Sequence, residues 1–386
     1  MRNWSMGSKT HILVNFVELP FVCISLFFDV GMKDDSICGI SHLTEHVIIE
    51  ELMKKEPELF RKNLINAYVD KEFTCFYATA LRENADEVIS VFSRLIDCMD
   101  ECLSKDIMES QKNIIYKIEN ERILSNPQLI NILLLEQLAF TGNVKNHTVV
   151  NEAFLTLGEE EIRKFCRQAY LSSSKHLIIS GAGYTPQSIK EFQDRYDSMP
   201  VAERGKNDSV DERTSFRIPL DKLENANDAR RTVAITMNDI GKAREYYALH
   251  IICLLYKVLL NNLLKETDFF IKDITVKLYT EKAIVFFSYN AYYDKTLTLL
   301  QGIELENCST LFRNLKKHFL YGYLRKSGDL LAFNKEIYKM NCFFGEYLSY
   351  KNMVEFIDSA SFDDIVLLHK KMLHGEYMMV PEFISG

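Results

Sequence analysis

The sequence predicts an α+β protein made of two tandem domains that are related to each other. Three observations lead to this prediction: the length of the chain, an internal repeat, and a polar stretch between the two copies. At 386 residues the chain is too long for one ordinary hydrophobic core. The stretch 184–215 is polar, and its later part carries proline, glycine and a run of charges. We therefore expect an N-terminal domain over 1–197, a linker over 198–213 and a C-terminal domain over 214–386.

The internal repeat is visible at two places that lie far apart in the sequence. His250 precedes an apolar helical pattern like the one that follows His46, and the two histidines are 204 residues apart (250 − 46). Near the C-terminus, Ile365 lies in a helix–strand pattern like that around Ile162, which is 203 residues earlier (365 − 162). Two near-equal offsets favour the duplication of one α+β unit.

Hydrophobic patterning predicts the elements of the first domain in order. Short runs rich in β-branched and aromatic residues predict strands at 12–17, 22–28, 66–69, 73–80 and 176–181. Longer stretches with apolar residues at helical spacing predict helices at 39–53, 83–99, 106–124, 128–140 and 159–170. Pro127 separates two of these helices, because a proline disfavours helical backbone at the residue before it.

The composition limits the partners and the compartment. A net charge of −8 and a pI of about 5.7 argue against nucleic acid and anionic membrane surfaces as partners. The nine cysteines are odd in number, scattered and without a C-x-x-C pair, which favours reduced thiols and a cytoplasmic location. The apolar N-terminal region is interrupted by Asn15, Glu18 and Pro20, and no other window is apolar enough to span a bilayer. We therefore expect neither a signal peptide nor a membrane span.

The stretch with the clearest chemistry is the motif H-x-x-E-H, formed by His42, Glu45 and His46. On a helix, residues four apart lie on one face, so the two imidazoles can share one metal ion. Glu45 lies on the adjoining edge of that face, where it can reach a metal-bound water without binding the metal. This order is the inverse of H-E-x-x-H and is typical of inverzincin zinc sites. Zinc suits two nitrogen ligands, a carboxylate and an open position.

Such a site needs a third protein ligand. The helix predicted at 106–124 offers three acidic side chains, those of Glu109, Glu119 and Glu121. The second copy offers no equivalent metal set, because at an offset of 204 Tyr246 replaces the first histidine and Leu249 replaces the glutamate.

The chain resembles peptidase family M16, the zinc peptidases of the pitrilysin and mitochondrial-processing-peptidase type. The matching stretches are Gly39–His46, Asn66–Val69, Phe73–Ala80 and the helix that ends at Ser125-Asn126-Pro127. The duplication and the length of the chain also match. The resemblance implies two α/β-sandwich domains, each a mostly antiparallel sheet packed with helices, with the metal site in the first.

The resemblance also implies the third ligand. In the family it is a glutamate of the later helix, which corresponds here to Glu119, 73 residues after His46 (119 − 46). Glu121 is the alternative, because a slip of one or two residues in this helix changes the match. The family often has a supporting glutamate seven residues before the ligand. This chain has Lys112 there, a departure that weakens the expected support of the site.

The activity implied is that of a zinc endopeptidase. The two histidines and the glutamate of the later helix would hold Zn²⁺, and Glu45 would carry a proton from water to the leaving amine. In the family the strand that matches Asn66–Val69 pairs with the substrate backbone. The resemblance therefore assigns peptide binding to Asn66, Ala67 and Tyr68.

A second departure concerns the partner. Many members present an arginine and a tyrosine from a stretch resembling L-R-E-x-x-G-L-A-Y. This chain has Lys265 in place of the arginine, and neither the glycine nor the tyrosine. A lysine lacks the forked geometry of arginine. The family encloses its substrate in four such units and this chain has two, so we expect a second M16-type chain in a heterodimer or a homodimer.

Two functions follow from the resemblance. The first is peptide hydrolysis. Small bacterial members resemble the peptidases that mature ribosomally made peptides, such as the precursors of subtilosin-type bacteriocins, and general peptide turnover is the alternative substrate range. The second function is that of a non-catalytic M16-like subunit, which binds peptide or scaffolds an active partner.

Overall fold

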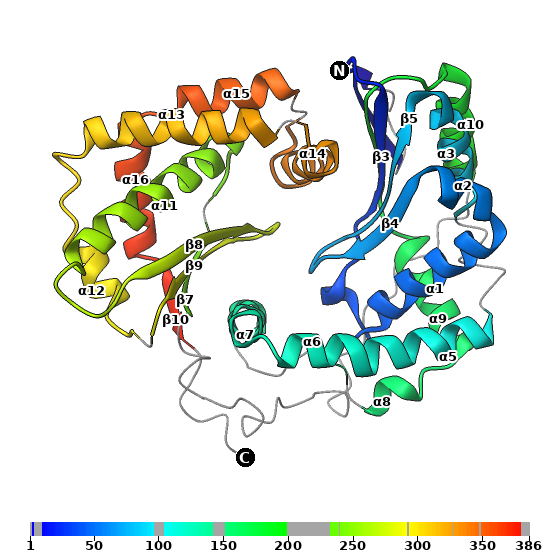
Figure 1. The fold of residues 1–386 in the computed structure, drawn as a ribbon, viewed down its shortest axis with the longest axis horizontal. Helices are drawn as coiled ribbons and strands as arrows, with labels where there is room; N and C mark the ends of the chain where they lie inside the picture. Colours follow the sequence, from blue (N-terminus) through cyan, green and yellow to red (C-terminus); the bar gives the residue numbers. More distant parts are fainter. Residues whose placement is uncertain are drawn as a thin grey trace. The chain divides into compact units, whose positions relative to one another are not determined.

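The structure is a computed structural model, and its chain falls into two compact units (Figure 1). It describes residues 2–3, 10–95, 104–141, 150, 152–198, 232–238, 240–291, 293–326, 328–346 and 349–379. Unit 1 comprises Met1–Asn120, His147–Phe216 and Asp329–Tyr338, and unit 2 comprises Glu121–Asn146, Arg217–Gly328 and Lys339–Gly386. The predicted linker at 198–213 lies, apart from its first residue, outside the described residues, so its boundaries stay a prediction.

Unit 1 is built on a six-stranded sheet in the order β1-β2-β6-β3-β5-β4. The strands are β1 (Arg2–Asn3), β2 (Thr10–Asn15), β3 (Phe21–Phe28), β4 (Leu64–Val69), β5 (Thr74–Leu81) and β6 (Lys175–Ser180). Neighbouring strands are antiparallel except for β2 and β6, which are parallel. The central strand β3 is apolar at most of its positions and buried along nearly its whole length, as expected for a strand covered on both faces.

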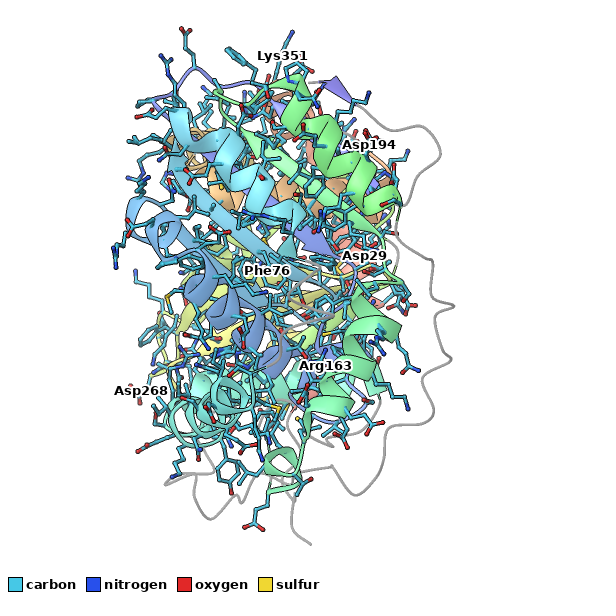
Figure 2. The ribbon with its side chains drawn as sticks, turned by 90° about the vertical axis from the view of Figure 1, so that its right-hand side faces the viewer. Asp29, Phe76, Arg163, Asp194, Asp268 and Lys351 are labelled. Atoms are coloured by element: carbon cyan, nitrogen blue, oxygen red, sulfur yellow. The ribbon has the colours of Figure 1, made fainter. Side chains whose placement is uncertain are left out.

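Helices pack on the sheet of unit 1, and α1, α3 and α10 contact β4, β3 and β2 respectively (Figure 1). The helical elements are η1 (Met32–Asp34), α1 (Ile40–Lys55), α2 (Pro57–Lys62), η2 (Arg82–Asn84), α3 (Ala85–Ser93), α5 (Lys105–Asn113), η3 (Ile114–Glu119), α8 (Glu152–Leu155), α9 (Glu159–Phe165), η4 (Cys166–Tyr170) and α10 (Pro186–Asp197). Phe76 lies in the interior between sheet and helices, whereas Arg163 and Asp194 lie on the outer helices (Figure 2).

The helix predicted at 106–124 is continuous but not uniform. It consists of α5, the π-helical segment η3 and α6 (Asn120–Leu124). At the end of the π-helical segment, the backbone N–H of Asn120 donates to the carbonyl of Ile115, five residues earlier. Segments of this kind often occur at functional sites.

Unit 2 contains a four-stranded antiparallel sheet in the order β10-β7-β9-β8. The strands are β7 (Thr232–Met237), β8 (Ile271–Leu278), β9 (Ala283–Tyr289) and β10 (Glu376–Met379). The helices of the second half are α11 (Ala243–Leu263), α12 (Thr296–Gln301), α13 (Ser309–Lys326), α14 (Leu330–Phe344), α15 (Tyr350–Ser359) and α16 (Phe362–Leu373), and α7 (Pro127–Thr141) comes from the first half.

The two sheets confirm the predicted duplication. The order β6-β3-β5-β4 in unit 1 matches β10-β7-β9-β8 in unit 2, and every pairing within both sets is antiparallel. The hairpin pair Val69 and Thr74 corresponds to Leu278 and Ala283, both at an offset of 209 (278 − 69 and 283 − 74). The fold is therefore the predicted α+β arrangement of two related, antiparallel-rich domains.

Each sheet is covered on its second face by a helix from the opposite half of the sequence. The first part of α14 belongs to unit 1, and α7 belongs to unit 2. The two helices carry equivalent buried asparagines, Asn334 and Asn131, which are 203 residues apart (334 − 131). Asn334 donates to the carbonyl of Cys23, and Asn131 donates to that of Thr232, each at 3.2 Å. Cys23 and Thr232 are themselves equivalent, at the offset of 209 (232 − 23), so the exchange of helices is reciprocal.

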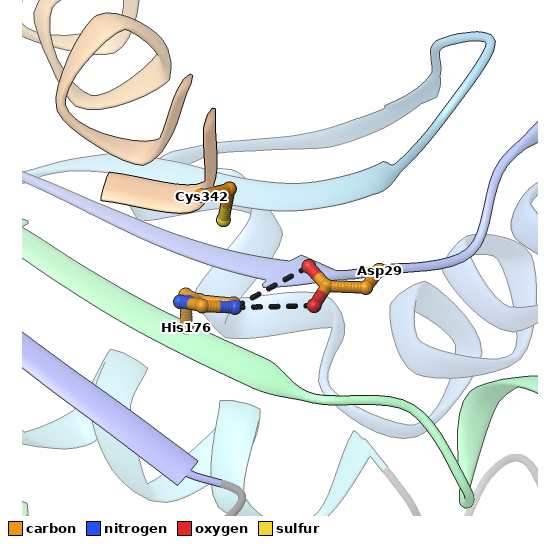
Figure 3. A group of neighbouring side chains, drawn as sticks. All are labelled: Asp29, His176 and Cys342. Carbon is orange, nitrogen blue, oxygen red and sulfur yellow. Dashed lines mark hydrogen bonds and ion pairs between the residues drawn. The ribbon is translucent and has the colours of Figure 1, made fainter. Parts of the chain in front are cut away.

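A buried polar cluster also holds the first part of α14 on the sheet of unit 1. Tyr338 donates to Oδ1 of Asp29 at 2.7 Å, and its ring stacks on Phe27 with the centroids 4.3 Å apart. Nε2 of His176 lies 3.3 Å from the same carboxylate (Figure 3). Although burial raises it, the pKa of Asp29 is lowered because His176 and Tyr338 hydrogen-bond to the carboxylate.

The two asparagines differ in their number of partners, and this difference predicts different stabilities. Asn334 makes four bonds in all, to the carbonyls of Cys23 and Ile178 and to the hydroxyls of Ser25 and Ser180. Asn131 makes the one bond to Thr232, and its Oδ1 has no partner among the described residues. We expect Asn334→Leu to lower the free energy of unfolding by about 2–4 kcal/mol, because it removes four hydrogen bonds from buried polar groups.

The matched variant Asn131→Leu should cost about 1 kcal/mol or less, because it removes one bond and one unpaired oxygen. Urea unfolding of the two variants measures both effects. Equal destabilisation by the two substitutions would contradict this account of the exchange.

One described helix, α11, is long and apolar enough to cross a membrane by length and composition. Half of its most apolar window is buried inside the protein, and α11 contacts β8, α13, α15 and α16. These contacts are those of a core helix of unit 2.

Candidate metal centre

The N-terminus of α1 is fixed by the residues that precede it. Gly39 has a φ of +86°, and a Cβ at this position would lie 2.5 Å from Cγ1 of Val150. The buried carboxylate of Asp35 accepts hydrogen bonds from the backbone N–H groups of Gly39, at 2.9 Å, and Ser41, at 3.1 Å. Because these bonds satisfy N–H groups at the start of the helix, the turn that carries His42 has a defined position.

His42, Glu45 and His46 lie together on α1, as the spacing predicts. The potential ligand atoms of the three side chains lie within 4.8 Å of one another. The two imidazole rings are 4.7 Å apart between centroids and nearly perpendicular. Glu45 is 4% exposed, and its Oε2 lies 3.9 Å from Nε2 of His46. Two imidazoles at this separation supply nitrogen ligands of the kind that suits zinc, and the carboxylate of Glu45 lies beside them.

The helix α5 packs against α1 and contributes a contact that the sequence did not predict. Oε1 of Gln111 lies 2.9 Å from Nδ1 of His46, and the side chain of Gln111 is buried. Lys112, which the resemblance aligns with a supporting glutamate, is also buried, but its Nζ donates to Glu109 at 2.8 Å and to the carbonyl of Leu155 at 3.2 Å. The neighbour of His46 on α5 is therefore Gln111.

The three candidate third ligands have different positions. Glu119 is the last residue of the π-helical segment η3, and its side chain lies outside the described residues. Glu121 is exposed and belongs to unit 2. The side chain of Glu109 is half exposed and pairs with Lys112. Glu119 stays the predicted ligand, and Glu121 stays its alternative.

Asn66, Ala67 and Tyr68 lie on β4, which is the edge strand of the sheet in unit 1 and packs against α1. Asn66 is exposed, and its Oδ1 accepts a hydrogen bond from the backbone N–H of Ala67 at 2.8 Å. Nζ of Lys335 lies 5.0 Å from the centre of the Tyr68 ring. Burial raises the pKa of Tyr68, so its hydroxyl is protonated at neutral pH.

Unit 2 keeps the geometry of the histidine pair without its chemistry. The rings of Tyr246 and His250 on α11 are 4.7 Å apart and nearly perpendicular, like those of His42 and His46. His250 stacks on Phe319 of α13, at 5.7 Å between centroids. His250 thus packs against an aromatic ring, whereas His46 meets the amide of Gln111. Among the described residues, no metal set is found in this part of unit 2.

Comparison with known proteins agrees with this geometry. The family model described as Insulinase (Peptidase family M16) matches residues 14–152, which include α1, β4, β5 and the helix that carries Gln111. This part of the chain, residues 14–152, is therefore similar to peptidase family M16.

Curated relatives match parts of this chain. The beta subunit of the mitochondrial-processing peptidase of Caenorhabditis elegans is 23% identical over 183 residues, which cover 45% of this chain and 39% of the relative. The uncharacterized zinc protease YmxG of Bacillus subtilis is 21% identical over 246 residues, which cover 61% of this chain and 58% of the relative. The chain thus spans less than two thirds of the length of either relative.

Solved structures share the fold of this chain. A protease from Helicobacter pylori has a TM-score of 0.69 at 11% identity and covers 97% of this chain and 98% of its own. A chain of complex III2 from Candida albicans, solved with Inz-5 bound, has a TM-score of 0.67 at 14% identity, with 96% and 92% covered. At these identities the similarity concerns the fold alone.

Proposed function

We propose that this chain is a zinc-dependent endopeptidase of peptidase family M16. The observation that carries the proposal is the clustering of His42, Glu45 and His46 on a helix that packs against the edge strand β4. A metal-binding face and an open strand edge are thereby held next to each other within one unit. The match of residues 14–152 to the family model supports the same activity.

The residues present fit a zinc ion. His42 and His46 supply two nitrogen ligands, and Glu119 is the proposed oxygen ligand. A bound Zn²⁺ would acidify a water molecule and polarise the scissile carbonyl. Glu45, which is buried beside His46, would accept the proton of that water and deliver it to the leaving amine.

The edge of β4 suits an extended peptide. Within the described residues β4 pairs with β5 alone, its register is unbroken, and it carries no charged side chain. The equivalent edge strand β8 contains a register shift between Ile271 and Asp273 and carries Lys272, Asp273 and Lys277. Bulges and charges protect edges against pairing. Because β8 has them and β4 has none, we assign the added peptide strand to β4, next to Asn66, Ala67 and Tyr68.

The substrate and the compartment complete the proposal. We assign to this chain the maturation of a ribosomally made peptide, such as a bacteriocin precursor, in the cytoplasm. The buried free thiols of Cys23, Cys75, Cys253 and Cys308 support a reducing compartment. The names of the relatives support a partner chain, since one is a peptidase subunit and one similar structure is a complex.

A second function, that of a non-catalytic subunit, is favoured by one observation. The stretch around Lys265, where many family members carry the arginine, is exposed and is held by its own contacts, with Asn290 bonded to Asp268 and Phe270. It presents no guanidinium to a substrate. Zinc content separates the two functions, because a purely scaffolding subunit has no need to keep a complete set of ligands.

The third ligand gives the sharpest test of the proposed site. We expect the wild-type chain to purify with about one equivalent of zinc, and Glu119→Gln to lose it, because a neutral amide is a much poorer ligand than a carboxylate. The matched variant Glu121→Gln, two residues away on the same helix, should keep its zinc. Metal analysis by mass spectrometry measures both. Zinc retained by Glu119→Gln and lost by Glu121→Gln would move the ligand to Glu121, and a wild-type chain that takes up no zinc would refute the proposed function.

A further inference from the structure

The side chain of His46 is held between two groups that contact different nitrogens of its ring. Nε2 faces Glu45, at 3.9 Å from Oε2, and Nδ1 faces Oε1 of Gln111 at 2.9 Å. Gln111 is 6% exposed, so its amide has little access to water. The imidazole therefore has one nitrogen on the side of the metal-binding group and one in a buried hydrogen bond.

This contact selects a tautomer of His46. An amide oxygen accepts hydrogen bonds and donates none, so Nδ1 must carry the proton in this pair. The lone pair is then on Nε2, the nitrogen that faces Glu45, and it is available to a metal ion. The partner on the second ring nitrogen of a metal-binding histidine fixes both the tautomer and the direction of the ring.

The π-helical segment explains why Gln111 rather than Lys112 makes this contact. An i→i+5 helix needs more residues for each turn than an α-helix does, so one extra residue is needed to return to the same face. The segment Ile114–Glu119 makes up most of the stretch from position 111 to the proposed ligand Glu119. Gln111, eight residues before Glu119 (119 − 111), therefore reaches the face that a residue seven before it would occupy in a regular helix. Lys112 faces Glu109 and Leu155 instead.

We propose that Gln111 is the positioning residue of the metal site, holding His46 through Nδ1 in the orientation and tautomer that bind the ion. This inference rests on the proposed zinc site. The neutral amide also sets the strength of the site. A carboxylate in the same place is a stronger acceptor and makes the imidazole a better donor to the metal. The chain therefore binds zinc more weakly than it would with a glutamate at position 111.

The test measures zinc affinity of the full chain by competition with a chromophoric chelator. Gln111→Met keeps the length of the side chain and removes the acceptor, and we expect its dissociation constant for zinc to rise about 10–100-fold. Gln111→Glu should rescue the affinity to the wild-type value or a tighter one. Lys112→Met is the matched control on the adjacent position and should change the constant by less than about threefold.

A spectroscopic measurement separates positioning from a loss of folding. The visible absorption bands of Co²⁺ bound in place of zinc report ligand geometry, and Gln111→Met should shift or weaken them while its thermal unfolding midpoint stays close to that of Lys112→Met. A wild-type chain that binds zinc together with an unchanged Gln111→Met would refute this inference and leave the proposed function intact. If Lys112→Met weakens zinc binding as much as Gln111→Met does, the assignment of this role to position 111 and not 112 is refuted. A wild-type chain that binds no zinc would refute both.

Discussion

Glu45→Gln should keep its bound zinc and lose peptide hydrolysis by about 10²–10⁴-fold, the contribution of a positioned general base. The amide has nearly the size of the carboxylate but cannot accept a proton from water. Glu45 is buried, so the substitution leaves the surroundings of the site in place. The effect should fall on kcat, because the role proposed for Glu45 is to move a proton in the reaction and not to hold the peptide.

Two variants on the same helix make this result specific. Glu51 is also a buried glutamate of α1, and its Oε1 accepts the backbone N–H of Ser104 at 2.7 Å, a bond that a glutamine can also accept. Glu51→Gln should therefore keep both zinc and activity. His46→Ala should lose zinc and activity together. If Glu45→Gln loses zinc as His46→Ala does, Glu45 is a ligand; if it keeps its activity, the base is another residue.

Mixing the chain with a second M16-type protein from the same source should raise its peptidase activity by about 10²–10³-fold, by analogy with restoring one oxyanion donor. Unit 2 has neither the arginine nor the tyrosine that many family members present, and Lys265 is exposed in its place. A homodimer would place the same stretch at both sites. The isolated chain should therefore bind zinc and cleave peptides slowly.

The gained activity has to be assigned either to this chain or to its partner, because the partner also carries an H-x-x-E-H motif. The partner is used with its own H-x-x-E-H glutamate replaced by glutamine, so that hydrolysis reports on the site of His42 and His46. Repeating the mixture with Glu45→Gln in this chain should abolish the gain. Rapid cleavage by the pure chain, unchanged by any partner, would show that the missing arginine is not needed.

Hydrophobic period and motif spacing were enough to predict most of the local elements and the helix face that gathers His42, Glu45 and His46. The spacing of four residues places His42 and His46 together wherever a helix forms, and the runs that became β4 and β5 have strand character of their own. The contact of Gln111 with His46 could not be predicted in this way. It depends on a π-helical segment, and the apolar pattern of a helix does not reveal where one extra residue is accommodated.

The exchange of α7 and the first part of α14 between the two halves could not be predicted from the sequence either. The stretch that forms α7 is apolar and clearly helical, but its pattern does not say which sheet it covers. Asn131 and Asn334 are the signal that could have found it, since the two asparagines lie at the repeat offset and each is buried in its helix. From the sequence alone these asparagines are hard to recognise as a sign of the exchange, because the strand carbonyls to which they donate are known only from the structure.

The exchange also has a consequence for synthesis on the ribosome. Domains usually fold one after another as they emerge, the N-terminal domain first. Here the sheet of unit 1 is complete when β6 has emerged, but residues 329–338, which cover its second face, are made about 150 residues later, a delay of roughly 10–30 s at 5–20 residues per second. During that interval the nascent chain lacks Asn334, and the hydroxyls of Ser25 and Ser180 and the carbonyls of Cys23 and Ile178 lack the hydrogen bonds that its amide makes. Unit 1 thus completes its native structure only after residues 329–338 have emerged, and a chaperone has a defined surface to protect until then.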